Sequence, residues 1–282
     1  MIDIKEKYKQ FCERQSIPFS IEESISSYDD TTLFCSAGMQ QFKSKFKDTN
    51  CKLETISNIQ PCLRMNDLDE IGDGSHLLYF NMMGLFSFRD ITIGHAINFW
   101  MKFIQQKLGL KVDYVTIHPD KKEWSWFYEQ WKISDIRYTD ECLWTDGDIG
   151  GYCTEFFIND VEIGNIVNPL GDCIDAGFGL ERLEMFVNKK VYTKEETLKE
   201  TLFKMINSGI KPSNTKQGYI LRKLLREVYI NNWIIDHPFF DSEVKRQQDI
   251  VSKYNRLKKR HSDKTKDWWM STLGIDIDSF KD

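Results

Sequence analysis

The spacing of apolar residues along the chain predicts strands mainly in its first two thirds and helices in its last third. In residues 91–109 the apolar positions follow a helical period and would share one face: Ile93, Ala96, Ile97, Trp100, Met101, Ile104 and Leu108. Residues 112–117 alternate apolar and polar side chains instead, which is typical of a strand. Helical spacing also opens the chain, at Ile4, Tyr8 and Phe11.

Turn-forming residues divide the segments with strand-like patterns into pairs. Strands are predicted near residues 56–64 and 76–88, joined by the turn-rich segment 66–75, and within residues 153–170 around the turn at Asn159 and Asp160. A helix rich in tryptophan is predicted over 122–132, and later helices over 178–188, 194–208, 215–233 and 242–260. The pattern favours an α+β fold, in which an antiparallel sheet flanked by helices (residues 1–190) precedes a helical region (residues 191–282).

Composition narrows the class of protein. The chain has 282 residues, 41% of them hydrophobic and 29% charged, which suits one or two ordinary globular domains. No apolar run is long enough to cross a bilayer and the first residues lack the pattern of a signal peptide, so we expect a cytoplasmic protein without membrane contact. Because the net charge is −5, RNA could be bound only by a local basic patch.

Cysteine and histidine are scattered rather than clustered. The seven cysteines include no Cys-x-x-Cys pair, and the five histidines are dispersed. This spacing argues against a disulfide scaffold and against a zinc site.

The stretch Asp175-Ala-Gly-Phe-Gly-Leu-Glu-Arg-Leu183 carries the clearest candidate chemistry. It reads as a strand that runs into a helix, with Gly177 and Gly179 allowing the backbone to approach a polyphosphate. Arg182 offers a planar cation for phosphate, and Asp175 a carboxylate for an ammonium group. The spacing matches neither the dinucleotide fingerprint nor a P-loop, and an ordinary strand-to-helix turn is the alternative.

Several segments of the chain, in order, resemble the class II aminoacyl-tRNA synthetases, and among them the alanyl-tRNA synthetase family. The nine-residue stretch is similar to motif 3 of that class, and Pro61-Cys-Leu-Arg64 with Asn66-Asp-Leu68 resembles motif 2. The other similar segments are 32–43, 80–88, 147–155, 162–167, and 212–214 with 218–222. The resemblance covers roughly residues 1–235. It implies a catalytic domain with an antiparallel sheet, followed by a truncated helical region that recognises the tRNA acceptor stem.

The resemblance implies that ATP and Mg²⁺ are bound and that two arginines are catalytic. Arg64 would bridge the α-phosphate and the substrate carboxylate, and Arg182 would hold the γ-phosphate. Phe80 would stack on adenine, unless it is simply a core residue, and Gly177 and Gly179 would complete the ATP site. Glu162 would be the Mg²⁺ ligand, with an exposed strand carboxylate as the alternative.

The resemblance also implies a site for a small amino acid. Asp175 would hold the substrate ammonium group, or else cap the following helix. Trp144 would close a small side-chain pocket, or else belong to the core, and Asn165 would lie beside the substrate. A pocket of this kind favours alanine but separates it from glycine or serine by only ~1–3 kcal/mol.

The tRNA contacts implied by the resemblance are Asn214, Arg222, Lys223 and Arg226. Asn214 could instead form a turn or cap a helix. The helix over 217–233 is less basic than its counterpart in the family, because Glu227 lies among its cations. Basic residues at 245–246 and 253–260 could add a contact surface, or be a solvated helix face. Residues 265–282 resemble the end of the family's helical region, so we expect the editing and C-terminal modules to be missing.

Three functions remain open. The first is ATP-dependent activation of alanine, or of another small amino acid, with transfer to tRNA. The second keeps the activation but transfers the aminoacyl group to a carrier protein or a small molecule, which the short segment after Arg64 and the less basic helix favour. The third is an inactive, synthetase-like accessory protein.

Overall fold

The computed structural model describes residues 1–273, apart from the side chain of Asp67. The chain divides into two compact units, residues 1–193 and residues 194 onward.

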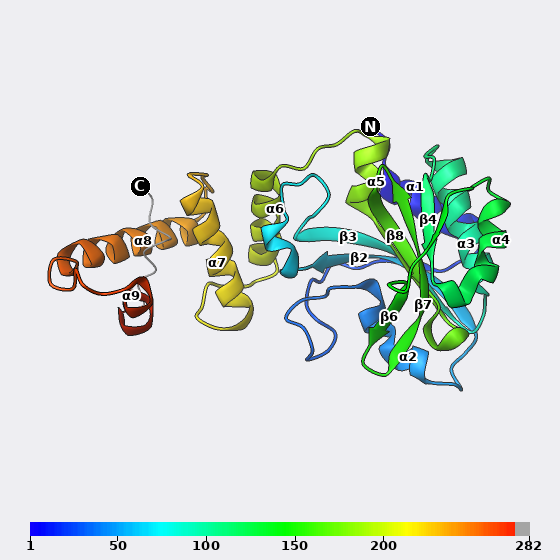
Figure 1. The fold of residues 1–282 in the computed structure, drawn as a ribbon, viewed down its shortest axis with the longest axis horizontal. Coiled ribbons are helices and arrows are strands. Elements are labelled where there is room, and N and C mark those ends of the chain that lie inside the picture. The colour runs from blue at the N-terminus through cyan, green and yellow to red at the C-terminus, as the bar shows by residue number, and fades with distance from the viewer. Residues whose placement is uncertain (274–282) are drawn as a thin grey trace. The chain divides into compact units, whose positions relative to one another are not determined.

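A nine-stranded sheet organises the described part of the first unit (Figure 1). Its order is β1-β2-β3-β9-β8-β7-β4-β5, with β6 paired to β7 off this path. The strands are β1 (Phe19–Ile21), β2 (Glu54–Leu63), β3 (Tyr79–Phe88), β4 (Tyr114–Ile117), β5 (Ile136–Tyr138), β6 (Leu143–Asp146), β7 (Ile149–Ile158), β8 (Val161–Val167) and β9 (Ile174–Gly179).

The sheet is antiparallel from β2 to β4 but parallel at both edges. Each edge strand, β1 and β5, pairs in parallel with its neighbour. Both parallel pairs are joined by crossover segments that contain helix, the connection that parallel strands require. The expected α+β class is confirmed, and the mostly antiparallel sheet has one parallel pair at each edge.

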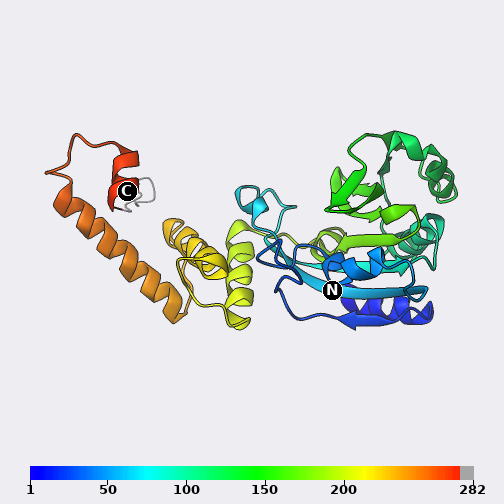
Figure 2. The same ribbon diagram turned by 90° about the horizontal axis from the view of Figure 1, so that it is seen from below.

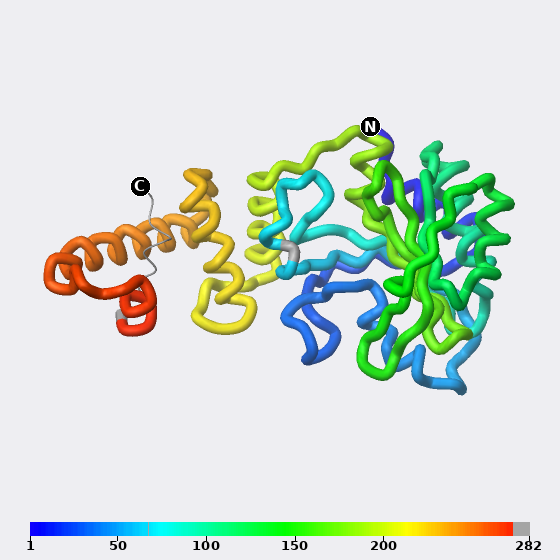
Figure 3. The backbone as a smooth tube through the Cα atoms, viewed as in Figure 1, coloured from blue at the N-terminus to red at the C-terminus, as the bar shows by residue number. Residues whose placement is uncertain are grey.

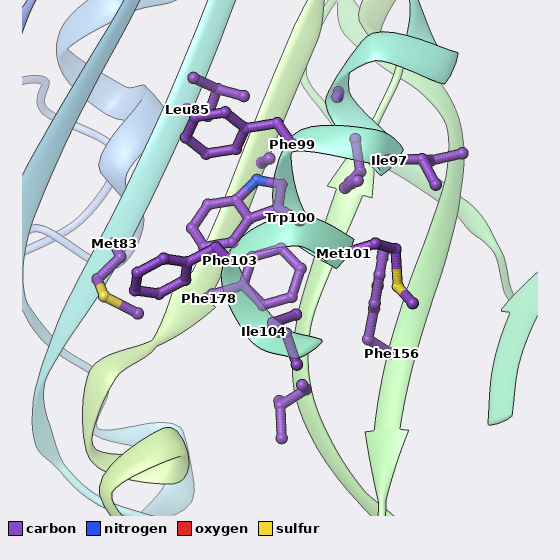
Figure 4. Packing of buried hydrophobic residues seen from close by; sticks show 14 of the residues in the cluster. Met83, Leu85, Ile97, Phe99, Trp100, Met101, Phe103, Ile104, Phe156 and Phe178 are labelled. Carbon is purple, nitrogen blue, oxygen red and sulfur yellow. The ribbon is translucent and has the colours of Figure 1, made fainter. Parts of the chain in front are cut away.

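One face of the sheet is buried under helices α1 (Ile4–Arg14) and α3 (Ile93–Met101). Trp100 lies at the centre of this core (Figure 4) and stacks on Phe178 of β9, with ring centroids 3.9 Å apart. Tyr8 of α1 stacks on the same indole, and its hydroxyl donates a 2.8 Å hydrogen bond to the carbonyl of Gly84. The apolar face predicted from residues 91–109 is therefore a core face.

Two predicted helices are less regular than their patterns suggest. The helix expected over 91–109 is α-helical only as α3 and continues as a π-helical segment, η3 (Lys102–Lys107). The helix expected over 122–132 is a 3-10 segment, η4 (Pro119–Trp124), followed by the short α4 (Ser125–Glu129), and Lys121 interrupts it with non-helical dihedral angles. Over 91–109 the apolar periodicity identifies the buried side chains but not the hydrogen-bond register.

The opposite face of the sheet is only partly covered. There η1 (Gly38–Phe42) and α2 (Lys43–Lys47) pack on β3, where Phe46 contacts Phe88 with centroids 5.1 Å apart. Strand β9 alternates between the two faces: Ile174, Ala176 and Phe178 are buried in the core. Asp175, Gly177 and Gly179, which point the other way, therefore face the partly covered side.

The ends of the first unit meet. Ile2 exchanges two hydrogen bonds with the side chain of Asn188, of 2.8 and 2.9 Å, directly after α5 (Leu180–Val187). Figure 3 shows the N-terminus beside this part of the chain. Helix α5 is thus attached to the sheet through β9 at its start and to the N-terminus at its end.

The second unit is helical in its described residues (Figure 2). Its helices are α6 (Lys194–Asn207), α7 (Lys216–Ile230), α8 (Pro238–Leu257) and α9 (Lys266–Leu273). None of the helices that the structure describes is long and apolar enough to cross a membrane. Of the boundary segment expected at 265–282, residues 274–282 lie outside the described residues.

Candidate active site

A single cavity on the partly covered face of the sheet collects the nine residues proposed for ATP, amino acid and metal. Its walls come from the end of β2, from β3, β6, β8 and β9, and from α5. The nine are Arg64, Phe80, Trp144, Glu162, Asn165, Asp175, Gly177, Gly179 and Arg182. Residues more than a hundred positions apart in the sequence therefore surround one space.

Arg182 lies in the first turn of α5 and is held from two sides. Its guanidinium donates a 2.7 Å hydrogen bond to the main-chain carbonyl of Glu162 and lies 3.4 Å from the carboxylate of the same residue. It also donates a 3.5 Å bond to the carbonyl of Ser75 in the loop between β2 and β3. These bonds fix the position of the cation while about a quarter of the side chain stays exposed.

Arg64 follows β2 and lies at the rim of the cavity. Its Nε donates a 2.9 Å hydrogen bond to the carbonyl of Ser36, and its guanidinium lies 5.1 Å from the centre of the Phe80 ring. The contact is a cation–π arrangement, which leaves the guanidinium exposed to solvent. Phe80 is half-buried and lines the cavity, so it is not an enclosed core residue.

Asp175 is a carboxyl group on the cavity wall without a cationic neighbour in the described residues. Burial raises its pKa from the usual 3.8 to about 7, because desolvation penalises the charged form and no nearby charge offsets this. Since Gly179 is the N-terminal cap of α5, the alternative that Asp175 caps this helix is wrong. An ammonium group in the cavity would supply the missing cation.

Trp144 and Asn165 complete the lining of the cavity. Trp144 comes from β6 and is half-buried, packing on the buried residues Cys142, Cys153 and Val167 while lining the cavity. The side-chain amide of Asn165 donates a long 3.5 Å bond to Glu162, which leaves its hydrogen-bonding capacity largely unused.

One charged residue of the cavity is missed by the sequence reasoning. Glu181 is 7% exposed and accepts hydrogen bonds of 2.8 and 2.7 Å from the main chain and side chain of Asn81. It therefore ties the start of α5 to β3, next to Phe80. The sequence does contain a signal for this role, because Glu181 is a charged residue that directly follows the apolar Leu180 and precedes Arg182.

The residues proposed for tRNA contact lie in the second unit, on α7 and just before it. Lys223 and Asn214 are exposed, and Arg226 is half-buried. Arg222 is mostly buried, with 15% of its side chain exposed. It hydrogen-bonds the side chain of Asn214 and lies 3.8 Å from the buried carboxylate of Glu243. Arg222 and Asn214 therefore contact each other, and Asn214 is not the helix cap, which is Thr215.

Fold and cavity together place two arginines and a carboxyl group around one space on the partly covered face of a mostly antiparallel sheet. The chain belongs to the class II tRNA synthetases (A): the model of that family matches residues 3–169.

Relatives in this family include two alanine–tRNA ligases. That of Tropheryma whipplei strain Twist is 27% identical over 79% of this chain and 33% of its own length. That of Chlamydia trachomatis serovar L2 is 27% identical over 86% of this chain and 37% of its own length. The chain thus spans about a third of the length of these relatives.

Among solved structures, the pyrrolysyl-tRNA synthetase of Desulfitobacterium hafniense resembles the chain. The identity is 14% and the TM-score 0.42, over 69% of this chain and 71% of the other.

Proposed function

We propose that the chain activates alanine, or another small amino acid, with ATP to form an aminoacyl-adenylate, and transfers the aminoacyl group to the acceptor end of a tRNA. One observation carries the proposal: Arg64, Asp175 and Arg182 line the same cavity. Two cations for phosphate and one carboxylate for ammonium are the charges that this reaction requires. We expect the reaction to take place in the cytoplasm.

Activation needs no nucleophile from the protein. The substrate carboxylate attacks the α-phosphorus of ATP, the bond to the bridging oxygen breaks, and pyrophosphate leaves with the electron pair. Catalysis then consists of orientation and charge stabilisation. Arg64, exposed at the rim, can donate to both the carboxylate and the α-phosphate, while Arg182 holds the far end of the triphosphate.

Phe80 offers an aromatic face for adenine. Arg64 lies over one side of this ring. A purine would therefore stack on Phe80 either opposite Arg64 or in its place, and the latter would free the guanidinium for the α-phosphate.

The cavity also fits a magnesium ion. Glu162 is a partly exposed carboxylate beside Arg182, and Mg²⁺ on nucleotides is usually held by one or two carboxylates together with phosphate and water oxygens. Bound there, Mg²⁺ would neutralise charge on the phosphates. Glu162 itself both orients Arg182 and offers a carboxylate oxygen.

Asp175 and Trp144 would select the amino acid. The desolvated Asp175 carboxylate gains a cation when an α-ammonium group binds, and a group without this charge would leave it unpaired. Trp144 limits the room for a side chain because it is fixed against Cys142 and Cys153. Bulky side chains are excluded by this wall more strongly than glycine or serine.

The second part of the proposal is the molecule that accepts the aminoacyl group. Lys223, Arg226 and Asn214 would contact the acceptor stem, with the exposed basic residues of α8 as a second surface. The contacts between Arg222, Asn214 and Glu243 favour a second candidate, transfer to a carrier protein or small molecule, because they occupy groups that would otherwise meet RNA.

Amino-acid-dependent exchange between ATP and pyrophosphate, measured over all twenty amino acids, tests the activation step. Charging of total tRNA by the same preparation then tests the acceptor. Exchange with alanine and charging would support the first function, and exchange without charging the second. Absence of exchange with every amino acid would contradict both and favour an accessory role.

A further inference from the structure

A compact group of metal-ligand atoms lies behind Trp144, apart from the residues proposed for ATP and Mg²⁺. The two sulfur atoms of Cys142 and Cys153 and a carboxylate oxygen of Glu155 all lie within 4.8 Å of one another. Both thiols are buried, and Glu155 is half-buried.

The fold brings these three residues together through the pairing of β6 with β7. Cys142 directly precedes β6, and its carbonyl accepts a 2.9 Å hydrogen bond from the main chain of Cys153. Cys153 and Glu155 are alternate residues of β7 and so point to the same face of the sheet. The two cysteines are not close in sequence, which is why their spacing does not predict a zinc site.

The hydroxyl of Thr116 on β4 joins two of the three groups. It accepts a 3.1 Å hydrogen bond from the thiol of Cys142 and donates a 2.9 Å bond to Glu155. Thr116 and Glu155 are directly paired across β4 and β7, so the sheet itself sets this geometry.

The charges around the group favour a cation. Within the described residues, Glu155 makes no ion pair, and its hydrogen-bond partner is the neutral Thr116. The charged residues that act on it are two further carboxylates, Glu141 and Glu162. Carboxylates withdrawn from water are stabilised by a cation, and no side-chain cation of the described residues pairs with the half-buried Glu155.

We propose that Cys142, Cys153 and Glu155 bind a divalent ion of the zinc type. Two thiolates and a carboxylate suit Zn²⁺, and tetrahedral ligands at Zn–S distances of about 2.3 Å lie roughly 3.8 Å apart, so a contraction of about 1 Å is enough. The fourth position is left to water or to the hydroxyl of Thr116. Each thiol releases its proton on coordination, so binding weakens as the pH falls.

The ion would fix the strand that carries Trp144. Cys142 lies two residues before this tryptophan, and the indole packs against the cluster that Cys142 and Cys153 form with Val167. The site would therefore brace the wall of the amino-acid pocket. The inference does not depend on the proposed function, because its test reads metal binding rather than catalysis.

Titration of the reduced, metal-free protein with Co²⁺ tests the site. Coordination by two thiolates gives sulfur-to-cobalt charge-transfer absorption in the near ultraviolet, saturating at one ion per chain and abolished by added Zn²⁺. We expect Cys142→Ser and Cys153→Ser each to remove most of this absorption, and Glu155→Gln to weaken Co²⁺ binding at least tenfold. Cys12→Ser, at an equally buried thiol, and Cys51→Ser, at a more exposed one, serve as controls and should leave it unchanged.

A measurement on the unaltered chain covers the case in which these variants do not fold. Zn²⁺ should slow alkylation of Cys142 and Cys153, followed peptide by peptide by mass spectrometry, and leave the rate at Cys51 unchanged. The proposal is overturned if wild-type protein shows no saturable Co²⁺ absorption, or if Zn²⁺ protects neither thiol. Absorption that is lost only in Cys51→Ser would also overturn it.

Discussion

The guanidinium of Arg182 lies 3.4 Å from the carboxylate of Glu162 and donates a 2.7 Å hydrogen bond to the carbonyl of the same residue. The cation that we propose for phosphate and the carboxylate that we propose for a metal ion thus contact each other. Both side chains are partly exposed, at 26% and 34%, so the ion pair is weak enough to open. A metal-bound nucleotide would replace this contact with one partner for each group.

Arg182→Ala should abolish amino-acid-dependent exchange between ATP and pyrophosphate. A cation aimed at developing phosphate charge contributes about 10²–10³ in turnover, so we expect a loss of at least that size. Arg137→Ala is the matched control, because this arginine pairs with Asp135 on the surface, away from the cavity. Full exchange by Arg182→Ala would show that the γ-phosphate is held by another group.

The pKa of Asp175 predicts how amino-acid use depends on pH. With a pKa of about 7, the carboxyl is neutral below that pH and cannot pair with an ammonium group. We expect kcat/KM for the amino acid to fall about tenfold per pH unit below pH ~7. Asp175→Asn should have a low kcat/KM throughout, without this pH dependence. Exchange measured from pH 5.5 to 8.5 in both proteins tests this pH dependence. If kcat/KM of Asp175→Asn also fell below pH ~7, the titration would belong to another group.

The same carboxyl should make the ligand-free protein less stable as the pH rises. Its folded-state pKa, about 7, lies above the usual 3.8, so between these values the folded state binds a proton that the unfolded state has lost. The free energy of unfolding therefore decreases through this window on account of Asp175 and levels off above it. Asp175→Asn should gain stability relative to wild type as the pH rises from 4 to 7. Urea unfolding at several pH values measures this difference, and a constant difference would contradict the assigned pKa.

Most of the proposed residues that line the cavity could be predicted from the sequence because each one lies in a short motif that can be recognised from its neighbours. Arg64, Asp175 and Arg182 are recognisable from a few neighbouring residues, and apolar periodicity was enough to place Trp100 in the core. Long-range pairing was not recoverable in the same way. Cys142, Cys153 and Glu155 come together only because β6 pairs with β7. Glu181 reaches its hydrogen-bond partner Asn81 only because β3 pairs with β9. The parallel pairing of both edge strands was equally unpredictable, because it depends on how the segments between β1 and β2 and between β4 and β5 pack on the sheet.

Trp144 should control the size of the amino acid that is activated. Trp144→Ala removes one wall of the cavity, so we expect weaker exchange with alanine and new exchange with larger apolar amino acids such as valine or leucine. Trp126→Ala is the control, since Trp126 is 58% exposed and not among the residues that line the cavity. Measuring kcat/KM for each amino acid separates a change in specificity from general damage. An unchanged preference for small side chains would place the selecting wall elsewhere.

Gly164 should be a stability determinant of the sheet that carries the site. A β-carbon there would lie 2.4 Å from the ring of Phe178 and 2.6 Å from the carbonyl of Gly177. Because Phe178 is stacked on Trp100 in the core, it cannot move aside easily, and we expect Gly164→Ala to lower the free energy of unfolding by about 1–3 kcal/mol or more. Gly179→Ala provides the comparison, since its β-carbon meets nothing closer than 3.4 Å and its cost should be smaller.

Phe178→Leu should cost less stability in the Gly164→Ala background than in the wild type, because it relieves the clash. Denaturant unfolding of the four chains of this double-mutant cycle measures the coupling, and strict additivity would show that the strain lies against the backbone rather than the ring.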